Sequence, residues 1–249
     1  MNLLLLGYGF TSFYLKKELD KLNYNIIVST RSKNNNKYLT DKDNFIIFDL
    51  LDLSTYKNIP NNTNIILTFS AEPFDNIKIL LEILKEKNSK ILLVLGTTSS
   101  YINKEGIIYE ESELNLLSER VKSEILLKKN GANILRLAGI WGEERNPFNW
   151  LQKGLIKNSN KTINLIHIKD IVNVIVFLIK SNISSEVFNL SDGQEYFWKD
   201  IWKYAFENKI VNTPCPPSDN REVRIIENKK IYSLLGNNYK FKTIYEEKI

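Results

Sequence analysis

The stretch NLLLLGYGFTS at residues 2–12 decides the fold, because an apolar run ends there in two glycines that are one residue apart. Leu3–Leu6 is continuously apolar, which is typical of a strand buried on both faces of a parallel sheet. Residues 11–22 then follow a helical pattern, with its apolar side chains at Leu15, Leu19 and Leu22. A buried strand, a glycine turn and a helix in this order predict a βα unit of a nucleotide-binding domain.

The glycine turn has what the binding of a dinucleotide requires. One glycine permits the tight bend, a second lets the backbone approach a pyrophosphate, and a third small residue lets the helix pack closely on the strand. Gly7, Gly9 and Ser12 occupy these positions, with serine in place of the third glycine. Phe10 and Thr11 would begin the helix, whose N-terminus faces the phosphates. The alternative is an ordinary strand-to-helix turn, but its place after the first strand favours the binding turn.

The rest of the chain alternates short apolar runs with amphipathic stretches up to residue 141. Strands are expected over residues 24–30, 45–48, 64–70, 90–95 and 133–137, and helices over 74–88 and 112–130. This alternation predicts an α/β fold with a parallel sheet covered on both faces, either doubly wound or closed into a barrel. The glycine turn favours the doubly wound Rossmann sheet.

The pattern changes beyond residue 141, where helical pieces are joined by polar loops. These pieces are expected over residues 147–157, 169–179, 198–208 and 228–235. They predict a small mixed C-terminal cap within a single domain, 1–249, since no linker separates them from the sheet. We expect 1–145 and about 162–190 to form the dinucleotide-binding core, and about 146–161 and 191–249 to form the substrate cap.

Composition excludes several classes of function. Cys215 is the only cysteine and His167 the only histidine of the 249 residues, so neither an internal disulfide nor a cysteine or histidine metal cluster is expected. The net charge of +5 is spread over lysines and not gathered with aromatic residues, so we expect no nucleic-acid partner. No apolar run approaches the length of a membrane span, and the start of the chain does not resemble a signal peptide. We therefore expect a cytoplasmic protein with no membrane partner.

The end of the second expected strand bears on the choice of cofactor. An NAD site usually has an acidic residue there for the ribose hydroxyls, whereas this chain has Ser29-Thr30-Arg31. The Arg31 guanidinium can bind a 2′-phosphate through two hydrogen bonds, which favours NADP, with NAD the alternative. Arg31 could also be only a surface residue. Asp49, after the third strand, could accept a hydrogen bond from the adenine amino group or cap a helix that begins near Leu53.

Several further motifs follow in a characteristic order. They are GYGFTS at 7–12, LGTTSSY at 95–101, ILRLAGIWG at 134–142, HIKD at 167–170, VFNL at 187–190, and NKK and LG at 228–230 and 235–236. In this order and spacing they resemble the extended short-chain dehydrogenase/reductase superfamily. More narrowly, they are similar to its atypical, NAD(P)-dependent epimerase/dehydratase-like branch. The resemblance extends over almost the whole chain.

The resemblance implies proton transfer by a strand-end Ser or Thr and by a Tyr-x-x-x-Lys pair on the next helix. A lysine four residues from the tyrosine lies on the same helix face and makes the phenol a usable acid or base. Thr97 matches the strand-end residue. The pair is missing: one register places Ser118 and Lys122 at its positions, and another places Leu116 and Arg120 there.

Other candidate residues flank this region. Tyr101 matches a family tyrosine on the strand-exit loop and could face the active site, although it does not fill the position of the pair. Ser70 and Ala71, after the fourth expected strand, are assigned to the cofactor site. The candidate substrate residues are Trp141, Arg145 and Arg221. The two arginines could bind an anionic substrate, whereas a surface ion pair for Arg145 and a packing role for Trp141 are the alternatives.

Two functions remain open. The first is an NAD(P)-binding oxidoreductase or epimerase/dehydratase-like enzyme that acts on a small polar metabolite, such as a nucleotide sugar. The second is a dinucleotide-binding sensor or scaffold that has lost turnover together with the tyrosine. The retained Thr97 and cap motifs favour the first function, and the missing pair favours the second. The resemblance also implies that the protein could be a homodimer.

Overall fold

The computed structural model of the chain describes residues 2–143, 145–156, 159–217, 222–236 and 239–246. The chain divides into two compact units, and each draws on three separate segments. The first unit comprises Met1–Ser100, Leu114–Arg136 and Ile171–Phe188, and the second comprises Tyr101–Glu113, Leu137–Asp170 and Asn189–Ile249. Of the residues expected in the dinucleotide-binding core, 101–113, 137–145, 162–170 and 189–190 belong to the second unit.

The first unit is built on a sheet of seven strands in the order β11-β7-β5-β4-β1-β2-β3. The strands are β1 (Asn2–Leu6), β2 (Asn25–Thr30), β3 (Phe45–Ile47), β4 (Asn64–Leu67), β5 (Lys90–Thr97), β7 (Asn133–Leu137) and β11 (Val187–Leu190). β1 pairs in parallel with both β2 and β4, so the strand order reverses between β1 and β4. The prediction of a doubly wound parallel sheet is confirmed, and the barrel alternative is wrong.

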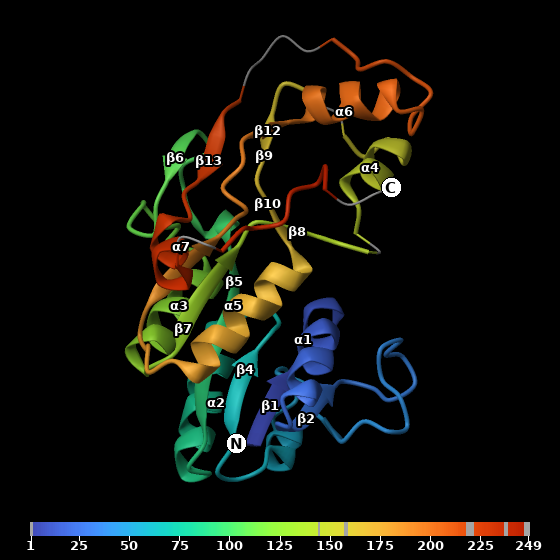
Figure 1. The fold of residues 1–249 in the computed structure, drawn as a ribbon. Helices are drawn as coiled ribbons and strands as arrows, with labels where there is room; N and C mark the ends of the chain where they lie inside the picture. Colours follow the sequence, from blue (N-terminus) through green and yellow to red (C-terminus); the bar gives the residue numbers. More distant parts are fainter. Residues whose placement is uncertain (1, 144, 157–158, 218–221, 237–238, 247–249) are drawn as a thin grey trace. The chain divides into compact units, whose positions relative to one another are not determined.

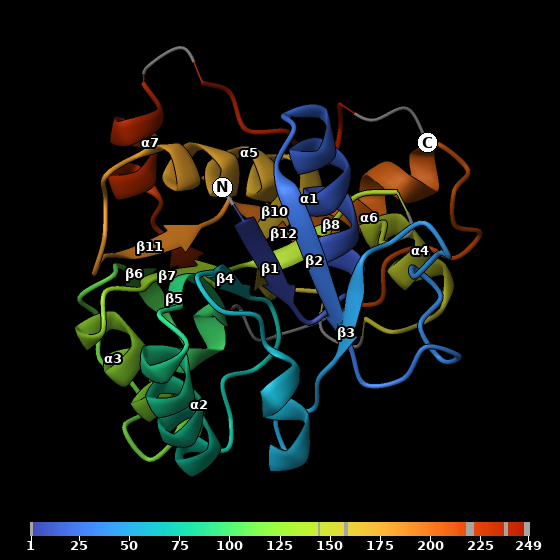
Figure 2. The same ribbon diagram turned by 90° about the horizontal axis from the view of Figure 1, so that it is seen from below.

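Helices cover both faces of this sheet. In Figures 1 and 2, α1 (Phe10–Lys21) and α5 (Ile168–Lys180) lie on one face, and α2 (Phe74–Glu86) and α3 (Glu119–Lys129) lie on the other. Leu3–Leu6 has no exposed surface on either side, as a central strand between two helical layers requires. Asn2, the first residue of β1, precedes this apolar run and is exposed.

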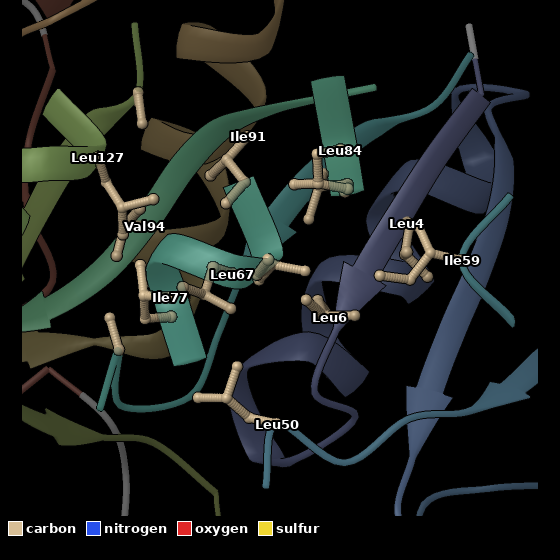
Figure 3. Packing of buried hydrophobic residues seen from close by; sticks show 14 of the residues in the cluster. Leu4, Leu6, Leu50, Ile59, Leu67, Ile77, Leu84, Ile91, Val94 and Leu127 are labelled. Carbon is tan, nitrogen blue, oxygen red and sulfur yellow. The ribbon is translucent and has the colours of Figure 1, made fainter. Parts of the chain in front are cut away.

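The core beneath α2 shows why these segments fold as they do (Figure 3). Leu4 and Leu6 of β1 belong to the same buried cluster as Ile77 and Leu84 of α2, and Ile91 of β5 completes this layer. The buried positions of α2 repeat at helical spacing, so one stripe of the helix faces the sheet. Short 3₁₀ helices at Leu53–Asn58 and Thr98–Ser100 complete the first unit.

One expected helix begins later than its sequence pattern predicts. The helix expected over residues 112–130 is α3 and starts only at Glu119, with Ser118 as its N-cap residue. The reason is local hydrogen bonding: the side chain of Asn115 accepts a bond from the Leu117 N–H, and the Asn115 N–H donates to the Ser100 carbonyl. Asparagine side chains that bond nearby backbone in this way stabilise turns in place of helix.

The second unit contains short strands and helices. Its strands are β6 (Gly106–Ile108), β8 (Gly139–Trp141), β9 (Thr162–Ile163), β10 (Leu165–His167), β12 (Tyr196–Phe197) and β13 (Arg224–Ile226), and they pair as β8 with β10, β9 with β12 and β6 with β13. Its helices are α4 (Pro147–Gln152), α6 (Trp198–Glu207) and α7 (Lys229–Leu235). Trp141, Phe148, Trp198 and Trp202 form much of its buried core. In the part of the chain that is described, no helix has the length and apolar character that crossing a bilayer would take.

Candidate functional site

The turn between β1 and α1 depends on Gly7. Its φ angle of +106° lies in the region that side-chain-bearing residues rarely adopt. A Cβ atom at this position would lie 2.8 Å from Phe69 Cδ1 and 2.9 Å from Thr68 Oγ1. Both the backbone conformation and the close approach of the residues that follow β4 therefore require glycine here.

Gly9 differs from Gly7, because the protein itself does not need a glycine there. Gly9 is the N-cap of α1 with an extended backbone (φ −115°), and a Cβ added to it would meet no atom within 4 Å. No side chain in the described ranges caps α1, and its first turn contains no acidic residue. The N-terminus of α1 is therefore suited to an anion, and the open space at Gly9 leaves room for one.

Ser12 performs the packing role of the third small residue. Its side chain is 1% exposed, and its hydroxyl contacts the Gly7 carbonyl and, at 2.9 Å, Thr68 Oγ1. The amides that begin the turn are engaged elsewhere: the Gly7 N–H donates to Ser29 Oγ at 2.8 Å, and the Tyr8 N–H donates to the Ser29 carbonyl. The turn is thus tied to β2 and β4, and the amides suited to a ligand begin after Tyr8.

A cleft of about 1350 Å³ lies in the first unit at the carboxyl ends of β1–β4. Parallel sheets bind ligands at this edge, where the strand order reverses. Among the candidate residues, those that line the cleft are Gly7, Gly9, Arg31, Asp49, Ser70 and Ser118. The other four cofactor candidates lie outside the lining set: Phe10, Ser12 and Ala71 are buried, and Thr11 is half-buried.

Phe48, Asp49 and Leu50 line the cleft beyond β3. One carboxylate oxygen of Asp49, Oδ1, accepts a hydrogen bond from the Leu51 N–H at 3.0 Å, which fixes the side chain beside the cleft. The alternative role of Asp49 as a helix cap is wrong, because Asp52 is the N-cap residue of the 3₁₀ helix and accepts from the Ser54 N–H.

Arg31 lies at the end of β2, exposed on the wall of the cleft. Within the described ranges it forms no ion pair, so its guanidinium is available to a ligand. Lys37 lines the same wall, with its ammonium group 4.8 Å from the centre of the Tyr38 ring. Two cationic side chains therefore lie on this wall of the cleft.

Asn36 is a site residue that sequence reasoning missed. Its side-chain amide donates to the Tyr8 carbonyl at 2.8 Å and to Thr30 Oγ1 at 3.3 Å, which ties the loop after β2 to the glycine turn. Its side-chain oxygen accepts from the Tyr38 N–H. In the sequence, Asn36 belongs to a run of asparagines and lysines typical of a solvated loop, so no local signal distinguished it.

A second group lies on the β4 side of the turn and includes Glu72, which sequence reasoning missed. Arg120 of α3 donates from Nε to Ser70 Oγ at 2.7 Å and from Nη2 to Glu72 Oε1 at 3.1 Å. Ser70 Oγ in turn donates to Glu72 Oε1 at 2.7 Å. Of the two possible registers for the missing pair, the first places Ser118 in the lining of the cleft, whereas Arg120 of the second contacts the lining residues Ser70 and Glu72 without lining the cleft itself. Lys122 is exposed on α3 and is not among the described residues that line the cleft.

The candidate catalytic hydroxyls have different surroundings. Thr97 ends β5, and its Oγ1 lies 3.1 Å from Ser99 Oγ. Ser118 lines the cleft, and its side chain does not cap α3. Tyr101 belongs to the second unit, where it is 1% exposed and its hydroxyl donates to Asn189 Oδ1 at 2.6 Å. This burial argues against proton transfer by Tyr101, and we remove it from the catalytic candidates.

Two of the candidate substrate residues, Trp141 and Arg145, belong to the second unit. Trp141 is 1% exposed and packs edge-on against His167, with 4.5 Å between ring centroids, so it is a core residue and not a substrate platform. Arg145 is exposed in a tight turn that is closed by two backbone bonds with Gly142. Arg221 lies outside the described residues.

Solved structures resemble the chain over almost its full length. A protein from Methylobacillus flagellatus, described as a candidate NAD-dependent epimerase/dehydratase, has a TM-score of 0.79 at 18% identity, with 95% of this chain and 92% of that protein covered. MoeE5, solved with UDP-glucuronic acid and NAD, has a TM-score of 0.75 at 16% identity, with 98% and 94% covered. The UDP-glucose 4-epimerase of Thermotoga maritima, solved with UDP-glucose, has a TM-score of 0.71 at 17% identity, with 92% and 91% covered.

These similarities were found by structure alone, since no protein-family model and no curated protein matches the chain. At identities of 16–18% they establish the fold. The motif resemblance predicts that same fold. The chain therefore has a Rossmann-type fold, which it shares with these solved structures.

Proposed function

We propose that the cleft of the first unit binds a nicotinamide dinucleotide. The observation that carries this proposal is the open space at Gly9, which the protein leaves unfilled beside an uncapped helix N-terminus. The pyrophosphate would lie across the start of α1, and the adenosine would lie over β2 and β3, with Asp49 accepting from the adenine amino group. MoeE5, which has the same fold, is solved with NAD.

We propose further that the preferred dinucleotide is NADP. Arg31 and Lys37 line the cleft where β2 ends, and the strand end offers no carboxylate to the ribose hydroxyls. A carboxylate would repel a 2′-phosphate, whereas a guanidinium without a partner attracts one. NAD is the alternative, and the two nucleotides are distinguished by direct titration.

For the reaction, we propose hydride transfer to or from a small polar metabolite such as a nucleotide sugar. A bound nicotinamide would supply the hydride acceptor or donor. The chain's own contribution would be to orient the dinucleotide and to offer hydroxyls, of which Thr97 and Ser118 are the candidates. Support for this substrate class comes from two proteins of the same fold, which are solved with UDP-glucuronic acid and with UDP-glucose.

A second candidate function is dinucleotide binding without turnover. Two observations favour it: the α3 segment contains no tyrosine, and the Tyr101 hydroxyl is bonded to Asn189 within a buried core. A serine hydroxyl has a far higher pKa than a phenol, so Ser118 would be a weak acid or base.

Titration and turnover assays test these functions in sequence. Fluorescence titration with NADPH and NADH is expected to show saturable binding of both, with the tighter binding for NADPH. Incubation of NADP or NAD with a panel of nucleotide sugars then reports turnover by absorbance of the reduced nicotinamide and by product analysis. Turnover that Thr97→Ala abolishes would support the enzyme, whereas tight binding with no conversion of any sugar would support the sensor or scaffold. Absence of binding by either nucleotide would refute both.

A further inference from the structure

The Glu72 carboxylate is held in one orientation on the β4 side of the cleft. Its Oε1 atom accepts two hydrogen bonds, from Ser70 Oγ at 2.7 Å and from Arg120 Nη2 at 3.1 Å. Arg120 also donates to Ser70 Oγ, so the three side chains form a closed ring of hydrogen bonds. Such charge-assisted bonds are stronger than neutral ones and restrict the carboxylate to this geometry.

The second oxygen of this carboxylate is left for a ligand. No described residue donates a hydrogen bond to Glu72 Oε2, and Glu72 is a lining residue of the cleft whose side chain is 44% exposed. The hydrogen bond from Ser70, together with Arg120, holds the pKa of Glu72 below its usual range. An ionised carboxylate can only accept hydrogen bonds, so this site selects hydroxyl or amino groups and repels phosphate.

The position in the sheet indicates which part of a ligand would reach Glu72. β4 and β2 are the two neighbours of β1, so Glu72 lies on the opposite side of the glycine turn from Arg31 and Asp49. A dinucleotide whose pyrophosphate crosses the turn and whose adenosine lies over β2 and β3 directs its second ribose toward the β4 side. That ribose carries two adjacent hydroxyl groups, which are the donors that a fixed, ionised carboxylate accepts.

We propose that Glu72 accepts the hydroxyl groups of the second ribose of the bound dinucleotide, and that Arg120 is the positioning residue that orients Glu72. This inference rests on the proposed function, because it requires a dinucleotide in the cleft. It assigns ribose recognition to a carboxylate on the loop after β4, in a chain that lacks the Tyr-x-x-x-Lys pair. Arg120 acts through Glu72 and does not itself line the cleft.

Calorimetric titration with ADP and ADP-ribose tests this inference, because ADP-ribose adds the second ribose as an ester on the terminal phosphate of ADP, which also removes one charge from that phosphate. The wild-type protein is expected to bind ADP-ribose more tightly than ADP. Glu72→Gln is expected to weaken ADP-ribose by roughly tenfold, the value of a hydrogen bond to a charged group, without weakening ADP. Glu82→Gln, which neutralises an exposed carboxylate on α2, is the matched control and is expected to change neither affinity.

The pH dependence of ADP-ribose binding tests the role of Arg120 separately. Without Arg120 the Glu72 carboxylate loses a partner that favours its ionised form, so its pKa rises. Arg120→Gln is therefore expected to weaken ADP-ribose binding more at pH 5 than at pH 7.5, and Arg120→Lys is expected to restore part of the affinity. Thermal unfolding of each variant checks that the fold is retained.

The possible results distinguish a failure of this inference from a failure of the proposed function. If the wild-type protein binds neither ADP nor ADP-ribose nor NADPH, the proposed function is overturned and the inference falls with it. If these ligands bind but Glu72→Gln does not weaken the binding of ADP-ribose, the inference alone is overturned. If Arg120→Gln weakens binding equally at both pH values, its positioning role is overturned.

Discussion

Arg136 and Glu124 form an ion pair in which Nε and Oε2 are 3.0 Å apart and the side chains are only 3% and 1% exposed. Arg136 belongs to β7 and Glu124 to α3, so the pair attaches this helix to the sheet. Ser100 Oγ also donates to Glu124, at 3.3 Å, and Gly96 lies so close that a Cβ there would be 2.5 Å from Oε1. The start of α3, which lines the cleft, therefore depends on a buried charge pair.

Arg136→Met is expected to lower the free energy of unfolding by about 3 kcal/mol or more, because it leaves a buried carboxylate without its cation. Urea denaturation measures the change, and Lys128→Met, at an exposed position of α3, is the control. The double variant Arg136→Met/Glu124→Gln is expected to recover part of the loss, since the neutral amide needs no cation. A loss of less than 1 kcal/mol in the single variant would show that the pair does not stabilise the unit.

The buried carboxyl group of Asp192, in the second unit, should make the unfolding free energy of the protein depend on pH. Its carboxylate is 5% exposed and accepts from the Gln194 N–H and from the Tyr196 hydroxyl. Burial raises the pKa of Asp192 to about 7, and the negative charge of Asp170 adds to the rise. The folded protein therefore holds a proton that the unfolded chain releases near pH 4.

Because the folded-state pKa is raised, the stabilisation by Asp192 is complete below about pH 4 and is lost as the pH rises through about 7. Between pH 5 and pH 8 the contribution of this residue to the unfolding free energy falls. Asp192→Asn is expected to flatten the unfolding profile over this range, as measured by thermal denaturation at a series of pH values. Equal slopes for the wild-type protein and the variant would contradict the assignment.

Arg31→Asp is expected to reverse the preference between the two cofactors. The new carboxylate would repel a 2′-phosphate and could accept from the ribose hydroxyls of NADH. NADPH affinity should fall by roughly tenfold or more, while NADH affinity is maintained or rises. Lys33→Asp, at a neighbouring residue that pairs with Asp41 and does not line the cleft, is the control. An unchanged NADPH affinity in Arg31→Asp would remove the argument for NADP.

Most of the first unit could be predicted because its signals are local in the sequence. The continuous apolar run Leu3–Leu6 predicts a buried strand, and the apolar stripe over residues 74–88 predicts a helix. The structure has the strand β1 and the helix α2 at these places. The start of α3 was missed because the side chain of Asn115 stabilises a turn, which periodicity does not report. The glycine turn was located correctly, but the bond from the Gly7 N–H to Ser29 joins residues 22 positions apart and has no sequence signature.

In the site, too, residues with a local sequence signal were predicted, and residues that depend on distant contacts were not. Arg31 and Asp49 were identified because each follows a strand whose end must lie at the cleft. Asn36, Glu72 and Arg120 were not assigned to the cofactor site, since their roles depend on contacts between loops and helices that are distant in the sequence. Trp141 and Tyr101 lie in motifs that carry the resemblance to the family, but their burial is seen only in the three-dimensional structure.

We expect Gly7→Ala to act mainly by destabilising the fold and not by removing a direct contact with a ligand. The backbone conformation is strained for alanine, and its Cβ would meet Phe69 and Thr68. We expect the unfolding free energy to fall by about 2 kcal/mol or more. Urea denaturation at pH 7 measures this change, and a variant as stable as the wild-type protein would contradict the described turn.

Gly9→Val tests the central claim most directly, because a Cβ atom at this position would meet no atom of the protein within 4 Å, whereas the side chain would stand where the ligand is proposed to bind. The substitution should change the unfolding free energy by about 1 kcal/mol at most, the scale of an N-cap preference. Calorimetric titration with NADPH and NADH is the decisive measurement. We predict saturable binding to the wild-type protein and a loss of affinity of roughly tenfold or more in Gly9→Val. Equal affinity of the folded variant and the wild-type protein, or no binding by either, would contradict a dinucleotide site at this turn.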